Sequence, residues 1–171
     1  MDMFPELFAG DVGLTSLQFA TGTEDNTAAA NHFVELFNPA LAHPENAITQ
    51  PQLTVVGIMA QSLATATVDL DVFTTTTSNV VSGSATAGPV WMDGRRADTS
   101  IGTFKAGSAS VPGSGLVWKT ALPAFPATGG VQPLILPFNW DLIQGQGLLV
   151  GTTGTARSII TLFWVERLQT S

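Results

Sequence analysis

The feature that most constrains this chain is the spacing of its apolar residues. From Asn31 onward, short apolar runs are separated by clusters of Gly, Pro, Ser and Asn, which is typical of strands joined by turns in a sandwich or barrel. The long apolar stripe with a period of about 3.6 residues that marks a helix is missing. Many Thr and Val and few Lys, Glu and Arg also favour strands. We therefore predict an all-β, antiparallel β-sandwich, with strands at 31–38, 52–61, 65–75, 101–106, 115–122, 131–137, 147–153 and 157–167.

Two of these segments indicate how their faces are buried. Around Val68–Val72 apolar and acidic residues alternate, so Asp69 and Asp71 are expected on a face that sees water. The last strand is apolar at nearly every position. Its two faces are expected to carry Ile160, Leu162 and Trp164 on one side and Ile159, Phe163 and Val165 on the other. Because a sandwich buries only one face of a strand in its core, the second face needs cover from an arm, a long loop or a neighbouring subunit.

The chain of 171 residues is expected to form one domain with an N-terminal arm. Residues 1–30 are interpreted as an acidic arm and residues 31–171 as the β-sandwich domain. The arm begins with an apolar patch at Phe4, Leu7 and Phe8, and its segment 14–20 can be read as extended. Residues 74–100 are low in complexity and are interpreted as a long loop or an excursion along a sheet edge.

Charge excludes one class of partner. Residues 1–50 hold seven of the 13 acidic residues and no Lys or Arg, so the net charge of −7 comes from this part alone. Nucleic-acid binding needs a basic surface that neutralises phosphates, and we do not expect it here. The first residues lack the pattern of a signal peptide, and no apolar stretch of about 18 residues occurs, so neither secretion by that route nor a membrane span is expected.

The charged residues are also few, at 11% of the chain. A small monomer normally covers its surface with more charge than this. One interpretation is that other copies or a partner protein cover part of the surface. The alternative is a surface rich in Thr, Ser and Gly, which hydrates well without charge.

A search for chemistry gives no catalytic assignment. The segments GSASVPGSG and GQG lack the residues that complete a phosphate-binding or dinucleotide-binding loop. His32 and His43 have no partners at the spacing of a zinc site or a catalytic triad. Asp69 and Asp71 could offer oxygens to Ca²⁺ or simply keep a strand face soluble. We therefore predict a protein that is not an enzyme and has no cofactor or metal, and the lack of Cys leaves no thiolate site.

One cationic and aromatic cluster stands out in the sequence. Trp91, Arg95 and Arg96 lie close together in the irregular segment. Such a group suits contact with an acidic protein surface or stacking on a sugar. A solvated loop tip explains the same residues equally well.

Two segments together resemble a known group of proteins. The segment HFVELFNPA at 32–40 leads into a pair of strands, and the chain closes with Pro137, a Gly145-x-Gly147 turn and the strand end Phe163-Trp164-x-Glu166. This arrangement resembles small accessory virion proteins of tailed bacteriophages. The resemblance, over about residues 31–168, implies a jelly-roll sandwich that forms homo-oligomers, trimers above all, and acts in head decoration, as a cement protein or in a fibre. Asn139–Asp141 depart from the simple turn expected there.

These observations give one leading functional prediction and one alternative. The leading prediction is a capsid decoration or cement protein, made in the host cytoplasm, that binds copies of itself and the major capsid or another virion protein. The alternative is a collar, tail or head-fibre module that binds a host surface glycan. The residues expected at interfaces are Phe4, Leu7, Phe8, Trp91, Arg95, Arg96, Ile159, Phe163 and Val165.

Overall fold

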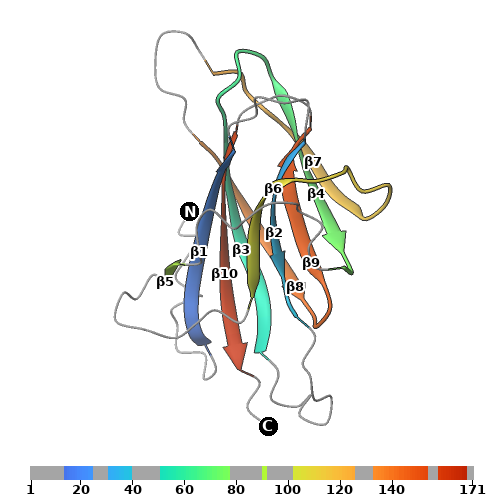
Figure 1. The fold of residues 1–171 in the computed structure, drawn as a ribbon. Coiled ribbons are helices and arrows are strands. Elements are labelled where there is room, and N and C mark those ends of the chain that lie inside the picture. Colours follow the sequence, from blue (N-terminus) through green and yellow to red (C-terminus); the bar gives the residue numbers. More distant parts are fainter. Residues whose placement is uncertain are drawn as a thin grey trace.

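The computed structural model describes residues 14–24, 31–39, 51–77, 90–91, 102–125, 133–153 and 158–168. This part of the chain contains strands and no helix. The strands form two antiparallel sheets packed face to face (Figure 1). The predicted all-β sandwich is therefore confirmed.

Each sheet has five strands. Sheet A contains, in spatial order, β5 (Val90–Trp91), β1 (Leu14–Glu24), β10 (Ser158–Leu168), β3 (Pro51–Ser62) and β8 (Leu134–Leu142). Sheet B contains β6 (Thr103–Ser108), β2 (His32–Phe37), β9 (Gly147–Thr152), β4 (Val68–Thr75) and β7 (Leu116–Leu122). Neighbours in each sheet are far apart in the sequence. The strand orders β1-β10-β3-β8 and β2-β9-β4-β7 are the interleaved order of a jelly roll, with β5 and β6 added at the edges.

The core lies between the two sheets. Alternate residues of the strands point inward, as period-2 patterning requires. Trp164 of β10 stacks on Phe104 of β6, with ring centroids 6.1 Å apart, and so connects the two sheets. The other large buried side chains of this core include Leu36, Leu53, Ile58, Leu70, Leu122, Leu142, Leu148 and Leu162. Burying each such side chain contributes about 1.5–3 kcal/mol.

Each strand predicted from residue 31 onward has an observed counterpart, with differences at the ends, and the short β5 was not predicted. The main difference is β8, which continues through Asn139–Asp141 where the resemblance led us to expect a turn. The reason is that Trp140 packs against the core while Asn139 and Asp141 lie exposed on the other face, so the alternation of a strand continues.

The N-terminal region holds a strand that the sequence indicated only as an extended segment. β1 pairs along its length with β10, and its outer neighbour is the two-residue β5. β5 lies within the predicted excursion 74–100 and forms an edge of sheet A. Residues 1–13 and 25–30 lie outside the described residues, so the arm and the domain boundary at residue 31 stay predictions.

Sheet B is buried on both faces over much of its area. Its outer face carries a second apolar cluster of Phe33, Phe73 and Leu149, with Ala109 packed against it. The rings of Phe33 and Phe73 meet edge to face, with centroids 6.1 Å apart. β6 and β7 lie at opposite edges of sheet B, so their connection must cross this outer face to join them (Figure 1). The chain thus covers the outer face of sheet B with its own β6–β7 connection.

Candidate interaction surface

The residues predicted at interfaces differ in how much of them the structure describes. Ile159, Phe163 and Val165 lie in β10 and are described with their side chains. Trp91 lies in β5, and its side chain is outside the description. The other predicted interface residues, Phe4, Leu7, Phe8, Arg95 and Arg96, lie outside the described residues, so their roles stay predictions.

The two faces of β10 are occupied as the alternation predicts. Its core face contributes Ile160, Leu162 and Trp164. On the outer face, Ile159 and Phe163 are half-buried, whereas Val165 is completely buried within the single chain. Val165 therefore needs no second copy to cover it, and among the apolar side chains described on this face of the strand only Ile159 and Phe163 retain exposed surface.

The strand register extends the outer face of β10 across β3 and β8. Thr161 lies opposite Met59 of β3, and Met59 lies opposite Ile135 of β8. In the next row, Phe163 lies opposite Gly57, which lies opposite Pro137. We name as the sheet-A patch five partly or largely exposed apolar side chains on the outer face of these three strands: Met59, Ile135, Pro137, Ile159 and Phe163.

Phe163 and Gly57 form the centre of this patch. A Cβ atom at Gly57 would lie 3.5 Å from Cδ2 of Phe163, so the aromatic ring lies over the glycine. Alanine at this position would place its Cβ in ordinary van der Waals contact with the ring. Ile135 is the most exposed member of the patch, at 56% of its surface. An isoleucine this exposed is unremarkable alone, but here it adjoins further apolar residues on the neighbouring strands.

A polar contact borders the patch. The hydroxyl of Thr54 donates a hydrogen bond of 2.5 Å to Oδ1 of Asp141, its cross-strand neighbour in β8. Thr54 is buried and Asp141 is exposed. This contact orients the carboxylate of Asp141 along the sheet. The five side chains of the patch itself carry no charge.

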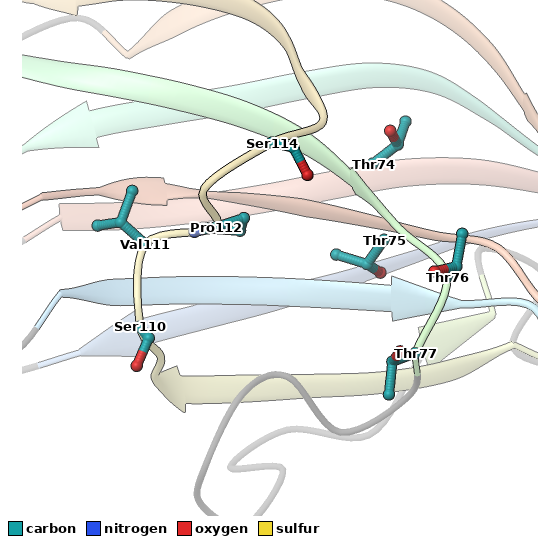
Figure 2. A pocket seen from close by; sticks show the side chains of 8 residues that line it. All are labelled: Thr74, Thr75, Thr76, Thr77, Ser110, Val111, Pro112 and Ser114. Carbon is teal, nitrogen blue, oxygen red and sulfur yellow. The ribbon is translucent and has the colours of Figure 1, made fainter.

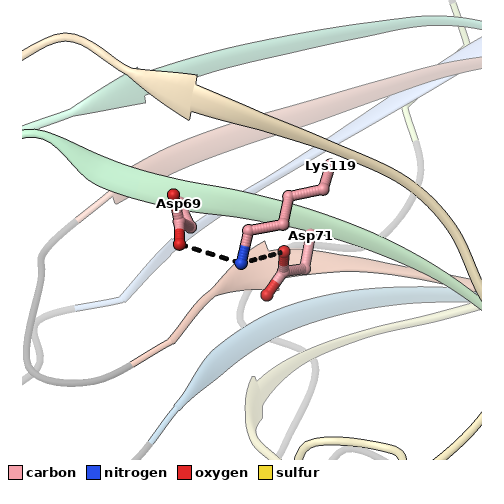
Figure 3. Close-up of polar contacts among 3 residues, drawn as sticks. All are labelled: Asp69, Asp71 and Lys119. Carbon is pink, nitrogen blue, oxygen red and sulfur yellow. Dashed lines mark ion pairs between the residues drawn. The ribbon is translucent and has the colours of Figure 1, made fainter.

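A separate charged cluster lies on the outer face of sheet B. Nζ of Lys119 in β7 lies 2.8 Å from Oδ2 of Asp69 and 3.4 Å from Oδ1 of Asp71, both in β4 (Figure 3). The hydrogen bond with Asp69 and the nearby Asp71 carboxylate raise the pKa of Lys119 above 10.5, against a smaller opposing effect of desolvation. One ammonium group thus pairs with two adjacent carboxylates, which is a structural role.

The expectation that both aspartates see water is wrong for Asp71. The side chain of Asp69 is half exposed, whereas that of Asp71 is only 6% exposed. The expectation assumed an open outer face. Instead, β4 lies inside sheet B between β7 and β9, and its outer side chains adjoin the apolar cluster of Phe33, Phe73 and Leu149.

Sequence reasoning missed three members of the patch: Met59, Ile135 and Pro137. Alternation in β8 alone places Ile135 on the face opposite Leu134 and Leu136, which was a usable signal. What the sequence could not supply is that β8 and β10 flank the same strand, β3, although they are distant in the chain. The patch depends on that strand order.

Within the described ranges, no group of three or more His, Asp or Glu side chains is placed to hold a metal ion. The same residues contain no helix of the length and hydropathy needed to cross a membrane. His32 begins β2, with its side chain outside the description, and His43 lies outside the described residues.

The residues behind the resemblance to phage virion proteins have definite places in the fold. Asn38 and Pro39 follow β2, and Pro137 lies in the edge strand β8. Gly145 lies in the connection between β8 and β9, and Gly147 is the first residue of β9. Comparison of the chain with models of protein families, with curated proteins and with solved structures finds no match.

Proposed function

We propose that this protein is a non-enzymatic structural component of a tailed-phage virion, a capsid decoration or cement protein that associates with copies of itself and binds the shell. The observation that supports the proposal best is the sheet-A patch. It spans three adjacent strands of a jelly-roll sandwich and keeps apolar surface exposed in the single chain.

The contrast between the two sheets supports an interaction role for this patch. The chain covers Phe33, Phe73 and Leu149 on sheet B with its own β6–β7 connection. On sheet A, Ile135 remains 56% exposed beside half-buried Met59 and Phe163. Exposed apolar surface of this kind is a usual feature of protein contact sites. The face of a sheet can also pack on another sheet with little rearrangement.

Charge favours the same surface for self-association. The chain carries a net charge of −7, so copies repel each other when charged surfaces meet. The sheet-A patch is uncharged and allows approach at a low electrostatic cost. Closed symmetry would bury it identically in every copy. A trimer is the expectation from the resemblance, and a dimer or a larger ring satisfies the same argument.

Self-association is tested with two matched substitutions. Ile135→Asp places a charge in the patch, whereas Leu116→Asp places one on β7 of sheet B at a residue that is similarly exposed, at 52%. Neither side chain is needed in the core, so both variants are expected to fold. Light scattering after size exclusion should show an oligomer for the wild type and Leu116→Asp, and a smaller species for Ile135→Asp. A monomeric wild-type protein would contradict the self-association part of the proposal.

The place in the virion is tested by a particle reconstruction. A decoration or cement protein should appear at high copy number over the capsid shell. A collar, tail or fibre module should appear at low copy number at one vertex or along the tail. Failure to find the protein in purified particles would refute the virion assignment, whatever the oligomeric state of the isolated protein.

A further inference from the structure

A hydroxyl-lined pocket lies between the end of β4 and the β6–β7 connection (Figure 2). Its volume is about 340 Å³, at the lower end of the range of about 300–1,000 Å³ for small-molecule sites. Thr74–Thr77 form one side, and residues 110–114 of the connection form the other. Six of the eight lining residues carry a hydroxyl group: Thr74, Thr75, Thr76, Thr77, Ser110 and Ser114.

Both sides of the pocket are held in place by the fold. Thr74 belongs to β4, and its backbone N–H donates a hydrogen bond of 2.8 Å to the carbonyl of Gly115. At the other end of the connection, the N–H of Ala109 donates to the carbonyl of Asn31 at 3.2 Å. Gly115 has a φ of 85°, and a Cβ there would lie 2.5 Å from the carbonyl oxygen of Thr74. This close approach requires glycine and fixes the connection against β4.

The remaining lining residues are Val111 and Pro112, and none of the eight is charged. Val111 is 43% exposed and offers apolar surface beside the hydroxyls. The floor residue Thr75 is buried, and its Oγ1 has no hydrogen-bond partner among the described residues. A hydroxyl without a partner beneath a polar pocket is unusual, because buried polar atoms are normally hydrogen-bonded.

The chemistry of the lining selects a class of ligand. A hydroxyl group donates one hydrogen bond, accepts two and rotates to suit its partner. The Thr74 hydroxyl already donates to the carbonyl of Gly115, and Oγ1 of Thr75 is buried. The exposed residues Thr76, Thr77, Ser110 and Ser114 therefore supply the hydroxyls that match a ligand presenting many hydroxyl groups. The C–H edges of such a ligand can lie against Val111 and Pro112. A charged ligand would find no counter-charge in the lining, and the net charge of −7 disfavours anions in particular. We infer that this pocket binds a neutral saccharide unit.

This inference does not depend on the proposed function, because the pocket lies on sheet B and the sheet-A patch lies on the opposite sheet. It also differs from the sugar-stacking role considered for Trp91, Arg95 and Arg96. The pocket residues offer hydrogen bonds without an aromatic platform, so binding is expected in the millimolar range, where the binding free energy is about −4 kcal/mol or weaker.

The test uses the full chain labelled with ¹³C at Thr and Val methyl groups, which report on Thr74–Thr77 and Val111 in a monomer or an oligomer. D-glucose, D-galactose and N-acetyl-D-glucosamine are titrated separately to about 100 mM, and N-acetylneuraminate serves as the anionic probe. Saturable shifts confined to the pocket methyl groups are expected with at least one neutral sugar, with weaker or no shifts for the anion.

Two variants complete the test. The double variant Thr76→Val, Ser114→Ala removes two hydroxyls and should weaken binding at least fivefold. Thr103→Val, at an exposed threonine of β6 outside the lining, should bind as the wild type does. The inference is overturned if none of the three neutral sugars shifts the pocket methyl groups, if the double variant binds equally well, or if the anion binds as tightly as the neutral sugars.

Discussion

The side-chain amide of Asn38 donates a hydrogen bond of 2.8 Å to the carbonyl of Leu142, 104 residues further along the chain. Asn38 is buried and also exchanges backbone bonds with the β8–β9 connection: its N–H donates to Gln146, and its carbonyl accepts from Gly145. One residue at the end of β2 thus fixes the turn between the edge strand of sheet A and the centre of sheet B. The Asn-Pro and Gly-x-Gly motifs are parts of one structural unit.

Substituting Asn38 tests the importance of this unit. Asn38→Ala removes the amide that donates to Leu142 in a buried site, and we expect it to lower the free energy of unfolding by about 1–3 kcal/mol. Asn139→Ala is the matched control, since Asn139 lies exposed on β8 and should change stability by less than about 0.5 kcal/mol. Urea denaturation measures both. An equal decrease in the free energy of unfolding in the two variants would contradict the role given to Asn38.

Gly147 offers a test of packing at the same end of the sandwich. A Cβ there would lie 2.5 Å from Oγ1 of Thr75 and 2.8 Å from Cδ2 of Phe37. Gly147→Ala is therefore expected to cost about 1–3 kcal/mol through overpacking. Gly113→Ala meets no atom within 4 Å and should be neutral or stabilise by about 0.4–1 kcal/mol. The melting temperatures of the two variants test this expectation, and that of Gly147→Ala should be the lower. A Gly147→Ala variant as stable as the wild type would show that Thr75 and Phe37 can move aside without cost.

The fold was largely predictable because its determinants are local. Alternation and turn residues locate β3, β4, β7 and β9 without knowledge of the partner strands. β1 was recognised only as an extended segment, since Gly, Thr and Ala dilute its apolar pattern and its main partner, β10, lies at the other end of the chain.

The sheet-A patch was less predictable for a physical reason. The outward face of β10 follows from period 2, so the sequence alone places Ile159 and Phe163 on it. The contributions of Met59 and Ile135 depend on β3 and β8 lying beside β10. The burial of Asp71 depends on β4 lying inside sheet B between β7 and β9, and no local pattern encodes that strand order.

β1 gives a prediction about the N-terminal region. A chain starting at residue 14 retains β1 and is expected to fold. A chain starting at residue 25 loses the strand that pairs with β10 from Leu14 to Glu24 and exposes one edge of β10. We expect this second variant to unfold at a lower temperature, and circular dichroism during heating measures it. Equal melting temperatures would mean that β1 contributes nothing to the stability of sheet A.

Lys119 gives a pH-dependent prediction. Its pKa is raised above 10.5 in the folded state, chiefly by the hydrogen bond with Asp69. A raised pKa stabilises the folded state below the unfolded pKa, and the contribution disappears as pH rises through the folded pKa. The difference in melting temperature between the wild type and Lys119→Met should thus stay constant between about pH 7 and 9 and shrink above about pH 10.5. It should be small and fall in high salt, because Lys119 and Asp69 are half exposed. A difference that grows in alkali would contradict this assignment.

The strongest prediction concerns β10. It lies between β1 and β3 in sheet A and pairs with both over its length. It also supplies Ile160, Leu162 and Trp164 to the core, where Trp164 stacks on Phe104 of the other sheet. Three such side chains contribute about 1.5–3 kcal/mol each, which together is comparable to the total stability of a domain, about 5–15 kcal/mol.

A chain that ends at residue 156 lacks β10 and is expected not to fold, because β1 loses its main partner and the core loses its largest side chain. A chain that ends at Leu168 retains the whole strand and serves as the control. Soluble yield and cooperative thermal unfolding, followed by circular dichroism, are measured for both. If the chain ending at residue 156 is soluble and unfolds cooperatively, β10 is dispensable, and the arrangement of sheet A described above is wrong.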